Sequence, residues 1–518
     1  MSSPPGTDAD STGDGDGGSR SDSDADAASR SLLPETRWQR DVVLILATLL
    51  GIYALFALIG LALDFDTNGI LNVLRELTLF AAVYAMLVLA LNLHWGYTGL
   101  FNIGVAGFMA VGVYTMAILT ASPDATAPGF GLPLWVGIVG GMAMAALVGL
   151  VAALPALRLR ADYLAIVTLG LSEIIRLTFQ SMQFSNALED ALGVATNGGS
   201  GMNFPGTRNV VQYAFYRGGD RTSEPTVLGD ALFGLGESFD VLPLVVLGWG
   251  YNVVLAIGVV AFYVLLVRIA NSPFGRVLKA IREDELVAAS LGKNTDLFKI
   301  KVFMLGCALM GLAGILWQGQ AGYTSPHEFR PELTFYVFIA LIIGGAGSNT
   351  GSVLGGLVFG TLLFQGPLYV PRLVAEGLSV AGVELGPPPN TFYDAALALG
   401  SLDPLPMLAY ATAGTNVSYL RFVLLGVVLI LVVQRRPEGL LGHRIETAAA
   451  VDLSNRSRTT ATDGGSSNSS SGSTATNADP GSMPTNADPG STPTDDRRDS
   501  TATTDERDPG STDGDPDE

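Results

Sequence analysis

Two stretches of this sequence carry no charged side chain over a length that could cross a lipid bilayer. Val42 to Leu63 covers 22 uncharged residues and Val241 to Val267 covers 27. A helix rises about 1.5 Å per residue and the hydrocarbon core of a bilayer is about 30 Å thick, so either stretch is long enough to span it. The composition agrees, because 48% of the residues are hydrophobic and only 15% are charged. The sequence therefore predicts an integral membrane protein.

Ten apolar segments follow one another along the chain. They lie near 42–63, 77–93, 99–121, 133–157, 163–180, 241–267, 302–322, 333–346, 350–366 and 417–434. We therefore predict an all-α fold, a polytopic transmembrane helix bundle of about ten spans, and a multi-pass location in the plasma membrane.

The distribution of basic residues supports the count of ten. The clusters are Arg37 with Arg40, Arg158 with Arg160, seven bases from Arg268 to Lys301, and Arg435, Arg436 and Arg444. With ten crossings all of them fall on one side, and cytoplasmic loops carry an excess of Lys and Arg. Both termini are thus expected in the cytoplasm.

The net charge of −19 belongs to the two ends of the chain. Residues 1–30 contain seven acidic and two basic residues, and residues 445–518 contain fifteen and five. The second stretch also repeats TNADPGSMP as TNADPGSTP, a low-complexity pattern. Such segments bury too little apolar surface to fold, so we predict disordered acidic tails at 1–36 and 445–518 around a membrane domain at 37–444. This composition suits a high-salt cytoplasm and argues against nucleic-acid binding.

Three connections stay open to interpretation. The long segments 181–240 and 367–416 fall outside the membrane, where we expect local structure or a docking surface. The string GGAGSNTG, from Gly344 to Gly351, forms either a tight turn or a re-entrant break shielded from lipid by protein.

The most informative polar segment is the loop 268–301. Its core, NSPFGRVLKAIREDELVAASLGKNTDLFKIK, begins with Pro273 and Gly275 and carries apolar Ile281, Leu286 and Ala289 at helical spacing. The pattern predicts a helical hairpin whose short amphipathic helix presents an apolar face beside charged residues. Such a helix suits docking into a groove on a partner protein.

The string GRVLKAIREDELVAASLGKN within this loop resembles the cytoplasmic coupling loop of permease subunits in branched-chain amino acid ABC transporters. The general coupling motif of ABC permeases is only loosely kept, since Leu286, Val287 and Ala288 stand where Glu, Ala and Ala are usual ahead of Gly292. The resemblance implies that this loop binds an ATPase subunit. The residues expected to do so are Arg282, Glu283, Asp284, Glu285, Ala288 and Gly292.

Other strings resemble the same family. They are ALNLHWGYTGLFNIGVAGFMAVGVY from Ala90 to Tyr114, LRLRADYLAIVTLGLSEIIRLTF from Leu157 to Phe179, Ile339 to Gly360, and RRPEGLLG at 435–442. Asn102 and Val105 depart from the Ser and His that many relatives carry there. Together the matches cover most of 70–365 and the end of the membrane domain.

The resemblance implies a heteromeric importer. This chain would pair with a homologous permease subunit, two ATPase subunits would bind ATP and Mg and hydrolyse the nucleotide, and an extracellular substrate-binding protein would deliver branched-chain amino acids (Leu, Ile or Val). The related permeases for urea or short amides are the nearest alternative, because they carry the same loop strings.

Four polar residues cluster in the glycine-rich segment near residue 100. Asn92, Tyr97, Thr98 and Asn102 accompany five glycines between Gly96 and Gly112. Small residues let membrane helices approach closely, so close packing is the simpler interpretation. A broken helix that lines the translocation path is the alternative.

Two further places carry polar groups within apolar segments. Glu173 and Arg176 stand three residues apart, so they can pair on one helix face where an isolated charge would cost about 3 kcal/mol. We expect the pair to face the bundle interior and favour a packing role over contact with substrate. Gln318 and Gln320 lie near a span end, where they either line the path or find polar partners at the membrane interface.

Several chemistries find no support. The sequence has no GxxxxGK[ST] loop, so ATP and other cofactors are not expected on this chain. The three histidines, His94, His327 and His443, share no metal-ligand spacing, and Cys307 stands alone in an apolar run. We see no catalytic constellation. An ion-coupled transporter would need more membrane carboxylates and internal repeats than we find, and a membrane scaffold would leave the 268–301 loop unexplained.

Overall fold

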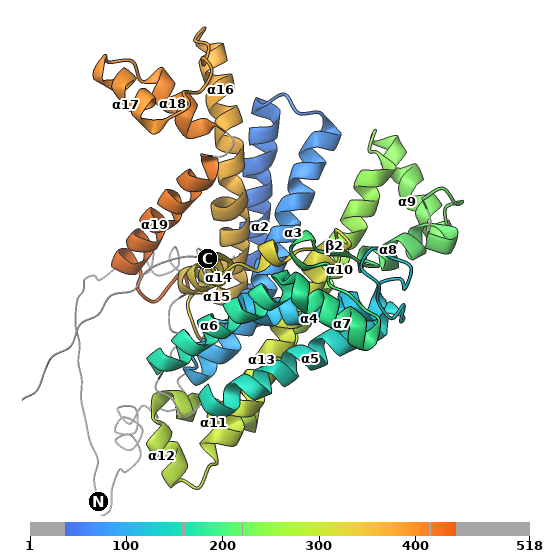
Figure 1. Ribbon diagram of the computed structural model, residues 1–518. Coiled ribbons are helices and arrows are strands. Elements are labelled where there is room, and N and C mark those ends of the chain that lie inside the picture. Colours follow the sequence, from blue (N-terminus) through green and yellow to red (C-terminus); the bar gives the residue numbers. More distant parts are fainter. Residues whose placement is uncertain (1–36, 157–160, 220, 414–415, 442–518) are drawn as a thin grey trace, which may run out of the picture. The chain divides into compact units, whose positions relative to one another are not determined.

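The computed structural model describes residues 37–156, 161–219, 221–413 and 416–441. The expected disordered tails at 1–36 and 445–518 lie outside these ranges. Within the described part, helices account for nearly all regular structure (Figure 1). The all-α prediction is confirmed.

Every one of the ten apolar segments contains a helix. These are α2 (Arg37–Ala62), α3 (Thr67–Leu91), α4 (Val105–Thr120), α5 (Leu134–Ala156), α6 (Ala161–Gln180), α10 (Pro243–Asn271), α13 (Thr295–Gln318), α14 (Pro331–Gly344), α15 (Asn349–Val358) and α19 (Val417–Arg435). Among the described residues, seven helical runs are long and apolar enough to span a bilayer, whereas α4 and α14 are apolar but shorter. The chain is a multi-pass membrane protein, and its ten crossings stay a prediction.

The remaining elements form the connections. The 268–301 loop holds α11 (Pro273–Glu283) and α12 (Glu285–Ser290). The connection 181–240 holds α7 (Met182–Leu192), η2 (Gly198–Ser200), β1 (Met202–Asn203), α8 (Arg208–Phe215), η3 (Arg217–Gly219) and α9 (Val227–Ser238). The remainder are the π-helices η1 (Asn92–Gly96) and η5 (Phe359–Gln365), β2 (Tyr323–Thr324), η4 (Pro326–Phe329), η6 (Gly366–Tyr369), α16 (Val370–Val380), α17 (Phe392–Gly400) and α18 (Leu405–Thr412). The expectation of local structure in both long connections is confirmed.

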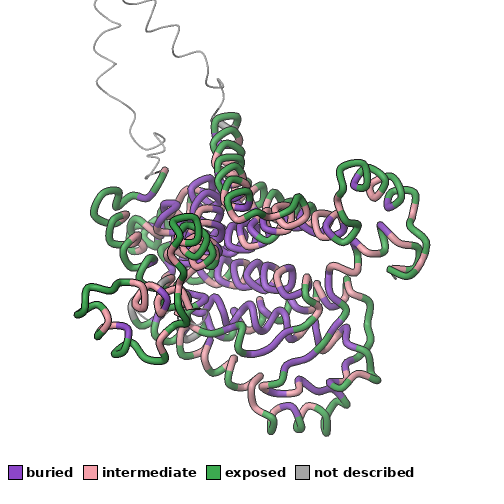
Figure 2. Tube along the Cα trace, turned by 90° about the horizontal axis from the view of Figure 1, so that it is seen from above, coloured by how far each residue is buried: buried purple, intermediate pink, exposed green. Residues whose placement is uncertain are grey.

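Helix α3 forms the centre of the bundle. In the apolar 18-residue stretch of the run Thr67–Gly96, 89% is buried inside the protein, compared with 22% in that of α10. Figure 2 shows the buried residues gathered on the inner helices. Glycines set the helix spacing: a Cβ on Gly112 would lie 2.6 Å from the Gly311 backbone, and one on Gly356 would lie 2.5 Å from that of Ala85. The packing interpretation of the glycines is therefore confirmed for these positions.

Four predicted boundaries were wrong. The segment near 77–93 starts earlier, because Asp66 caps α3 by accepting from the Gly69 N–H at 2.9 Å. The segment near 99–121 becomes helical only at Val105, and α13 starts at Thr295 rather than near 302. The segment near 350–366 continues through η5 and η6 to Val380.

The GGAGSNTG string forms a tight turn between α14 and α15. Gly345 and Gly347 adopt positive φ angles of 101° and 91°, which other residues avoid. Ser348 then caps α15 by accepting from the Gly351 N–H at 3.0 Å. Of the two alternatives, the turn is correct.

We distinguish the two ends of the helix bundle by the secondary-structure elements that lie there. The coupling-loop end holds α11, α12, the last turn of α10 and the first turn of α13. The opposite end holds α8, α9, the first turn of α10 and the last turn of α13, where β1 pairs with β2 in an antiparallel register of Met202 with Thr324. Cys307 lies between these ends on α13, fully buried beside Gly149 of α5.

Candidate functional site

The 268–301 loop folds as the predicted helical hairpin. Ser272 caps α11 by accepting from the Gly275 N–H at 3.2 Å, with Pro273 at the first helical position. Asp284 caps α12 and accepts from the N–H groups of Leu286 and Val287 at 2.9 and 3.0 Å. Because the Asp284 backbone is extended, the chain changes direction between two short helices. The hairpin is thus held by local caps that the sequence contains.

One face of the hairpin is turned toward the bundle. The Arg282 guanidinium donates to the carbonyl of Gly96, at the end of η1. Ala288 is 2% exposed, so it packs inside and is not available to a partner. Glu285 forms an ion pair with Lys299 of α13. Three of the six expected coupling residues therefore hold the hairpin onto its own bundle.

The other face is open and apolar. Leu286, Val287 and Leu291 are 80%, 55% and 74% exposed. The prediction that Leu286 shares a face with Ile281 was wrong, because the break at Asp284 turns α12 away from α11 and leaves only Ile281 buried. Glu283, Asp284 and Gly292 are exposed beside this surface, and Gly292 has a φ of +76°. We call Leu286, Val287 and Leu291 the α12 surface.

The membrane helix facing Arg282 is broken, and its place in the translocation path stays a prediction. Helix α3 ends in the π-helix η1, and residues 99–104 have no regular structure before α4 begins. Tyr97 and Thr98 are buried there, and the Thr98 hydroxyl donates to the His94 carbonyl at 2.5 Å. π-Helical turns often occur at functional sites.

Asn92 ties this break to the α14–α15 turn. Its side-chain oxygen accepts from the Gly347 N–H at 2.7 Å, and its amide nitrogen donates to the Asn349 side chain at 3.2 Å. Asn92 is fully buried. A buried amide with both ends bonded fixes the relative position of two helices.

His94 ties the same break to α13. Its Nε2 lies 3.2 Å from the carbonyl of Val302 and 3.1 Å from that of Phe303, and its Nδ1 lies 3.1 Å from the Asn102 amide nitrogen. Carbonyls only accept hydrogen bonds, so Nε2 carries the proton and Nδ1 accepts from Asn102. The ring also stacks on Phe303 at 4.9 Å between centroids. Both flanks of the coupling loop thus contact η1, α11 through Arg282 and α13 through His94.

Comparisons with known proteins agree with this arrangement. Residues 73–372, more than half of the chain, match the family model described as branched-chain amino acid transport system / permease component. The chain belongs to this permease family.

Individual relatives carry names from the same transport systems. The high-affinity branched-chain amino acid transport system permease protein LivM of Escherichia coli K12 is 31% identical over 55% of this chain and 61% of its own length. A probable LivM of Methanocaldococcus jannaschii is 25% identical over 56% of this chain and 80% of its own. LivH of Escherichia coli K12 is 35% identical over 19% of this chain and 32% of its own. The permease thus spans about three fifths of the first of these relatives, and no solved structure matches it.

The charged pair of α6 is present in the permease. Arg176 makes two hydrogen bonds to Glu173, at 2.8 and 2.5 Å, and one to Gln180 at 2.9 Å. The Arg176 side chain is 13% exposed and that of Glu173 is 35%. The predicted pairing is confirmed, and Arg176 is the more enclosed partner.

Gln318, the last predicted path residue, lies in the last turn of α13 and is 6% exposed. Within the described part of the chain its amide nitrogen has no hydrogen-bond partner. Asn92, Tyr97, Thr98 and Asn102 gather in and directly after η1, whereas Gln318 lies in the last turn of α13 and the charged pair lies on α6.

Sequence reasoning missed His94 and Asp41. His94 was considered only as a metal ligand, and the described residues contain no group of His, Cys, Asp and Glu that could hold a metal. Asp41 of α2 is buried and accepts from the Thr350 hydroxyl at 2.9 Å. The signal for both was a polar residue within or beside an apolar run, which in a membrane needs a partner.

Proposed function

We propose that this permease is a membrane-spanning subunit of an ATP-binding cassette importer that carries branched-chain amino acids into the cytoplasm. Its family and the printed names of its relatives support this function. The observation that carries the proposal is the α12 surface, which lies at the tip of a loop bonded directly to a break in the central membrane helix. No observation favours urea or amides over amino acids.

The α12 surface would bind an ATPase subunit. Three large aliphatic side chains exposed together suit a groove on a partner, and truncating the central residue of such an interface typically costs more than about 1 kcal/mol. Glu283 and Asp284 would form the charged rim. ATP and Mg would bind to the ATPase subunits, and this chain would hold neither.

The inward contacts would transmit the movement of the ATPase. A displaced α11 pulls on Gly96 through Arg282, while α13 pulls on His94 through its two carbonyls. Both forces reach η1, where the break before α4 supplies a joint between two packed elements. Rocking of rigid helices about such a joint gives alternating access.

The complete importer would hold a homologous permease subunit, two ATPase subunits and an extracellular substrate-binding protein. The LivH similarity supports the paired permease. The coupling-loop end would face the cytoplasm, together with both termini, in agreement with the basic residues of the loop.

The test separates docking from transmission in the purified assembly. Leu286→Ser with Leu291→Ser should reduce co-purification of the ATPase subunit about tenfold, because it removes the apolar contact. The matched control is Leu235→Ser on α9, an exposed leucine at the opposite end. Full retention of the ATPase by the double variant would contradict the docking assignment.

Transmission is tested with Arg282→Gln, which should retain the ATPase but lower leucine uptake per ATP hydrolysed in proteoliposomes. Arg276→Gln is the control, because Arg276 is exposed on the same helix. Equal uptake per ATP in both variants would show that Arg282 does not couple the two parts.

A further inference from the structure

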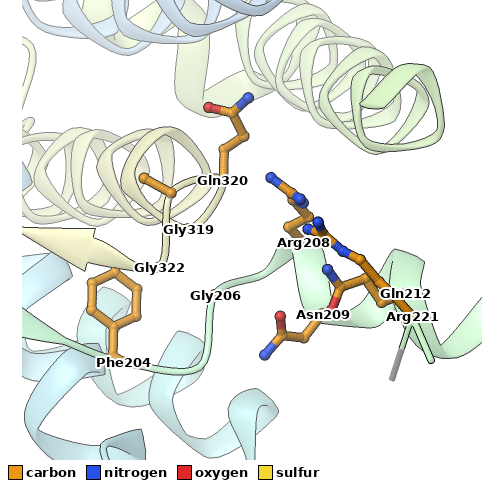
Figure 3. A pocket seen from close by; sticks show the side chains of 10 residues that line it. Phe204, Gly206, Arg208, Asn209, Gln212, Arg221, Gly319, Gln320 and Gly322 are labelled. Carbon is orange, nitrogen blue, oxygen red and sulfur yellow. The ribbon is translucent and has the colours of Figure 1, made fainter. Parts of the chain in front are cut away.

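A polar recess of about 230 Å³ opens at the opposite end of the bundle. Figure 3 shows Gln320 projecting from the turn after α13, and Arg208, Gln212 and Arg221 from α8 and the segment after η3. The two sides belong to segments about one hundred residues apart in the sequence. The recess therefore exists only in the folded protein.

The recess has the chemistry of an anion site. Two guanidinium groups line it, together with the amides of Asn209, Gln212 and Gln320, and none of the described residues that line it is a carboxylate. In the orientation of the Gln212 amide that satisfies its neighbours, its oxygen accepts from Arg221 Nε and Nη2 at 3.2 and 3.1 Å. This contact uses one edge of the Arg221 guanidinium and orients the group. Guanidinium groups bind carboxylates with paired hydrogen bonds.

The wall that carries Arg208 is fixed to α13. The Arg208 N–H donates to the Gly319 carbonyl at 3.2 Å, and the Phe204 N–H donates to that of Gly322 at 2.9 Å. Gly206 lies so close to Gly319 that a Cβ would overlap its carbonyl oxygen. Binding sites work when their side chains are held by rigid supports. Here the support is the end of a transmembrane helix.

The recess lies beside a buried polar group with no partner. Gln318 directly precedes the turn that forms the recess floor, and its amide nitrogen has no hydrogen-bond partner in the described part of the chain. A buried amide without a partner is costly. Gln320 in the recess and Gln318 behind it offer successive polar contacts from the recess into the bundle.

The arginines at and near the recess also lie on the proposed outer side of the membrane, where basic residues are less common. Basic residues in membrane proteins favour the cytoplasmic side, yet Arg208, Arg217 and Arg221 occur within fourteen residues of the connection at the end opposite to the coupling loop. Arg217 pairs with Glu224 at 3.6 Å. Arg208 and Arg221 line the recess instead.

We propose that this recess is a carboxylate-binding site that receives the α-carboxylate of the transported amino acid at the outer surface, before the substrate enters the bundle. The inference rests on the proposed function for its orientation and for the class of substrate. Its volume suits one small molecule better than a protein surface. Phe204 provides an apolar wall for an aliphatic side chain.

The experiment measures weak ligand binding to the complete importer in nanodiscs, without nucleotide or binding protein, by saturation-transfer NMR. The probes are L-leucine, isovalerate, a branched carboxylate that lacks the ammonium group and is one carbon shorter than leucine, and leucinamide, which lacks the carboxylate. In the wild type we expect leucine and isovalerate to bind and leucinamide to bind at least tenfold more weakly. The double variant Arg208→Gln with Arg221→Gln should bind leucine and isovalerate about tenfold more weakly than the wild type. Its affinity for leucinamide should be unchanged.

Arg217→Gln is the matched control, because it removes a neighbouring arginine that does not line the recess, and it should bind all probes as the wild type does. Arg208→Lys with Arg221→Lys keeps the charge and should recover part of the binding, which separates a loss of ligand contact from misfolding. The proposal is overturned if the double Arg→Gln variant binds isovalerate as tightly as the wild type does. It is overturned in favour of a protein partner if that variant also loses capture of the binding protein, since the carboxylate would then belong to a protein side chain.

The proposed function fails separately. A wild-type importer that takes up no leucine with ATP and binding protein present would overturn that function, whatever the recess binds. Normal leucine uptake combined with arginine-independent carboxylate binding would overturn the recess alone.

Discussion

Two regions of the permease differ in whether their buried polar groups have hydrogen-bond partners. Around η1, next to the coupling loop, Asn92, His94 and Asn102 are fully buried and each is bonded to another segment or to its neighbour. At the opposite end, Thr207 and Tyr251 are bonded to each other, but Gln318, Thr324 and Trp249 have buried polar atoms with no hydrogen-bond partner among the described residues. Bonded groups rigidify a structure, whereas unbonded ones are available to water or a ligand. The difference suits an end that transmits force and an end that receives substrate.

The largest effect is expected for Asn92→Leu, which keeps the side-chain size but removes two hydrogen bonds. The Gly347 N–H and the Asn349 side chain would lose their partner in a buried place, at a cost of about 1–3 kcal/mol for each group. Thermal unfolding of the detergent-solubilised permease should show a clear fall in midpoint temperature. An unchanged midpoint would mean that the coupling-loop end is not rigid.

Gly306→Ala comes next. A Cβ at this position would overlap the His94 ring, which cannot withdraw because Asn102 and α13 hold both of its nitrogens. Overpacking of this kind costs about 1–3 kcal/mol. Gly170→Ala is the control, because no atom lies within 4 Å of its Cβ position. In the same measurement, the midpoint temperature of Gly306→Ala should be well below that of Gly170→Ala.

A smaller effect is expected for the α6 pair. Glu173→Gln or Arg176→Gln alone should destabilise the importer by about 1 kcal/mol, since Glu173 is partly exposed and its ion pair is weakened accordingly. The double variant should cost less than the sum of the two single variants. Strict additivity in this cycle would show that the pair contributes no coupling energy.

The smallest effect on stability is expected for Gln318→Met. Its amide nitrogen has no partner to lose, so an apolar side chain of similar length should change the stability by less than about 0.5 kcal/mol. Leucine uptake should nevertheless fall if Gln318 contacts the substrate. If Gln318→Met lost as much stability as Asn92→Leu, the distinction between bonded and unbonded buried polar groups in the two regions would be wrong.

Much of the fold could be predicted from the sequence, because membrane helices are selected by local hydrophobicity. All ten apolar segments contain helices, and Ser272, Pro273 and Asp284 are local caps that a reader can find in the loop. The sequence left close packing and a broken helix as alternatives for the glycine-rich segment, since glycine and polar residues indicate both equally well. The structure shows both, because Gly112 packs on Gly311 and the backbone is irregular after η1.

The direction of single side chains could not be predicted. Arg282 points inward and Leu286 outward because the chain turns at Asp284, and helical spacing counted across that turn gave the wrong face. The recess was equally hidden, since Arg208 and Gln320 belong to no motif and are brought together by the contacts of Gly206 and Arg208 with Gly319. Partners more than one hundred residues apart leave no periodic signal.

The enclosed position of Cys307 has a practical consequence for following the proposed movement. It is the single cysteine of the chain, and its sulfur is sealed between α5 and α13. Maleimide dyes should therefore not react with Cys307 in the folded protein. A reporter thiol introduced by Arg276→Cys, at an exposed position of α11 outside the α12 surface, can be labelled selectively without first removing the native cysteine. The helix contact at Gly149 then stays undisturbed during fluorescence recordings of turnover.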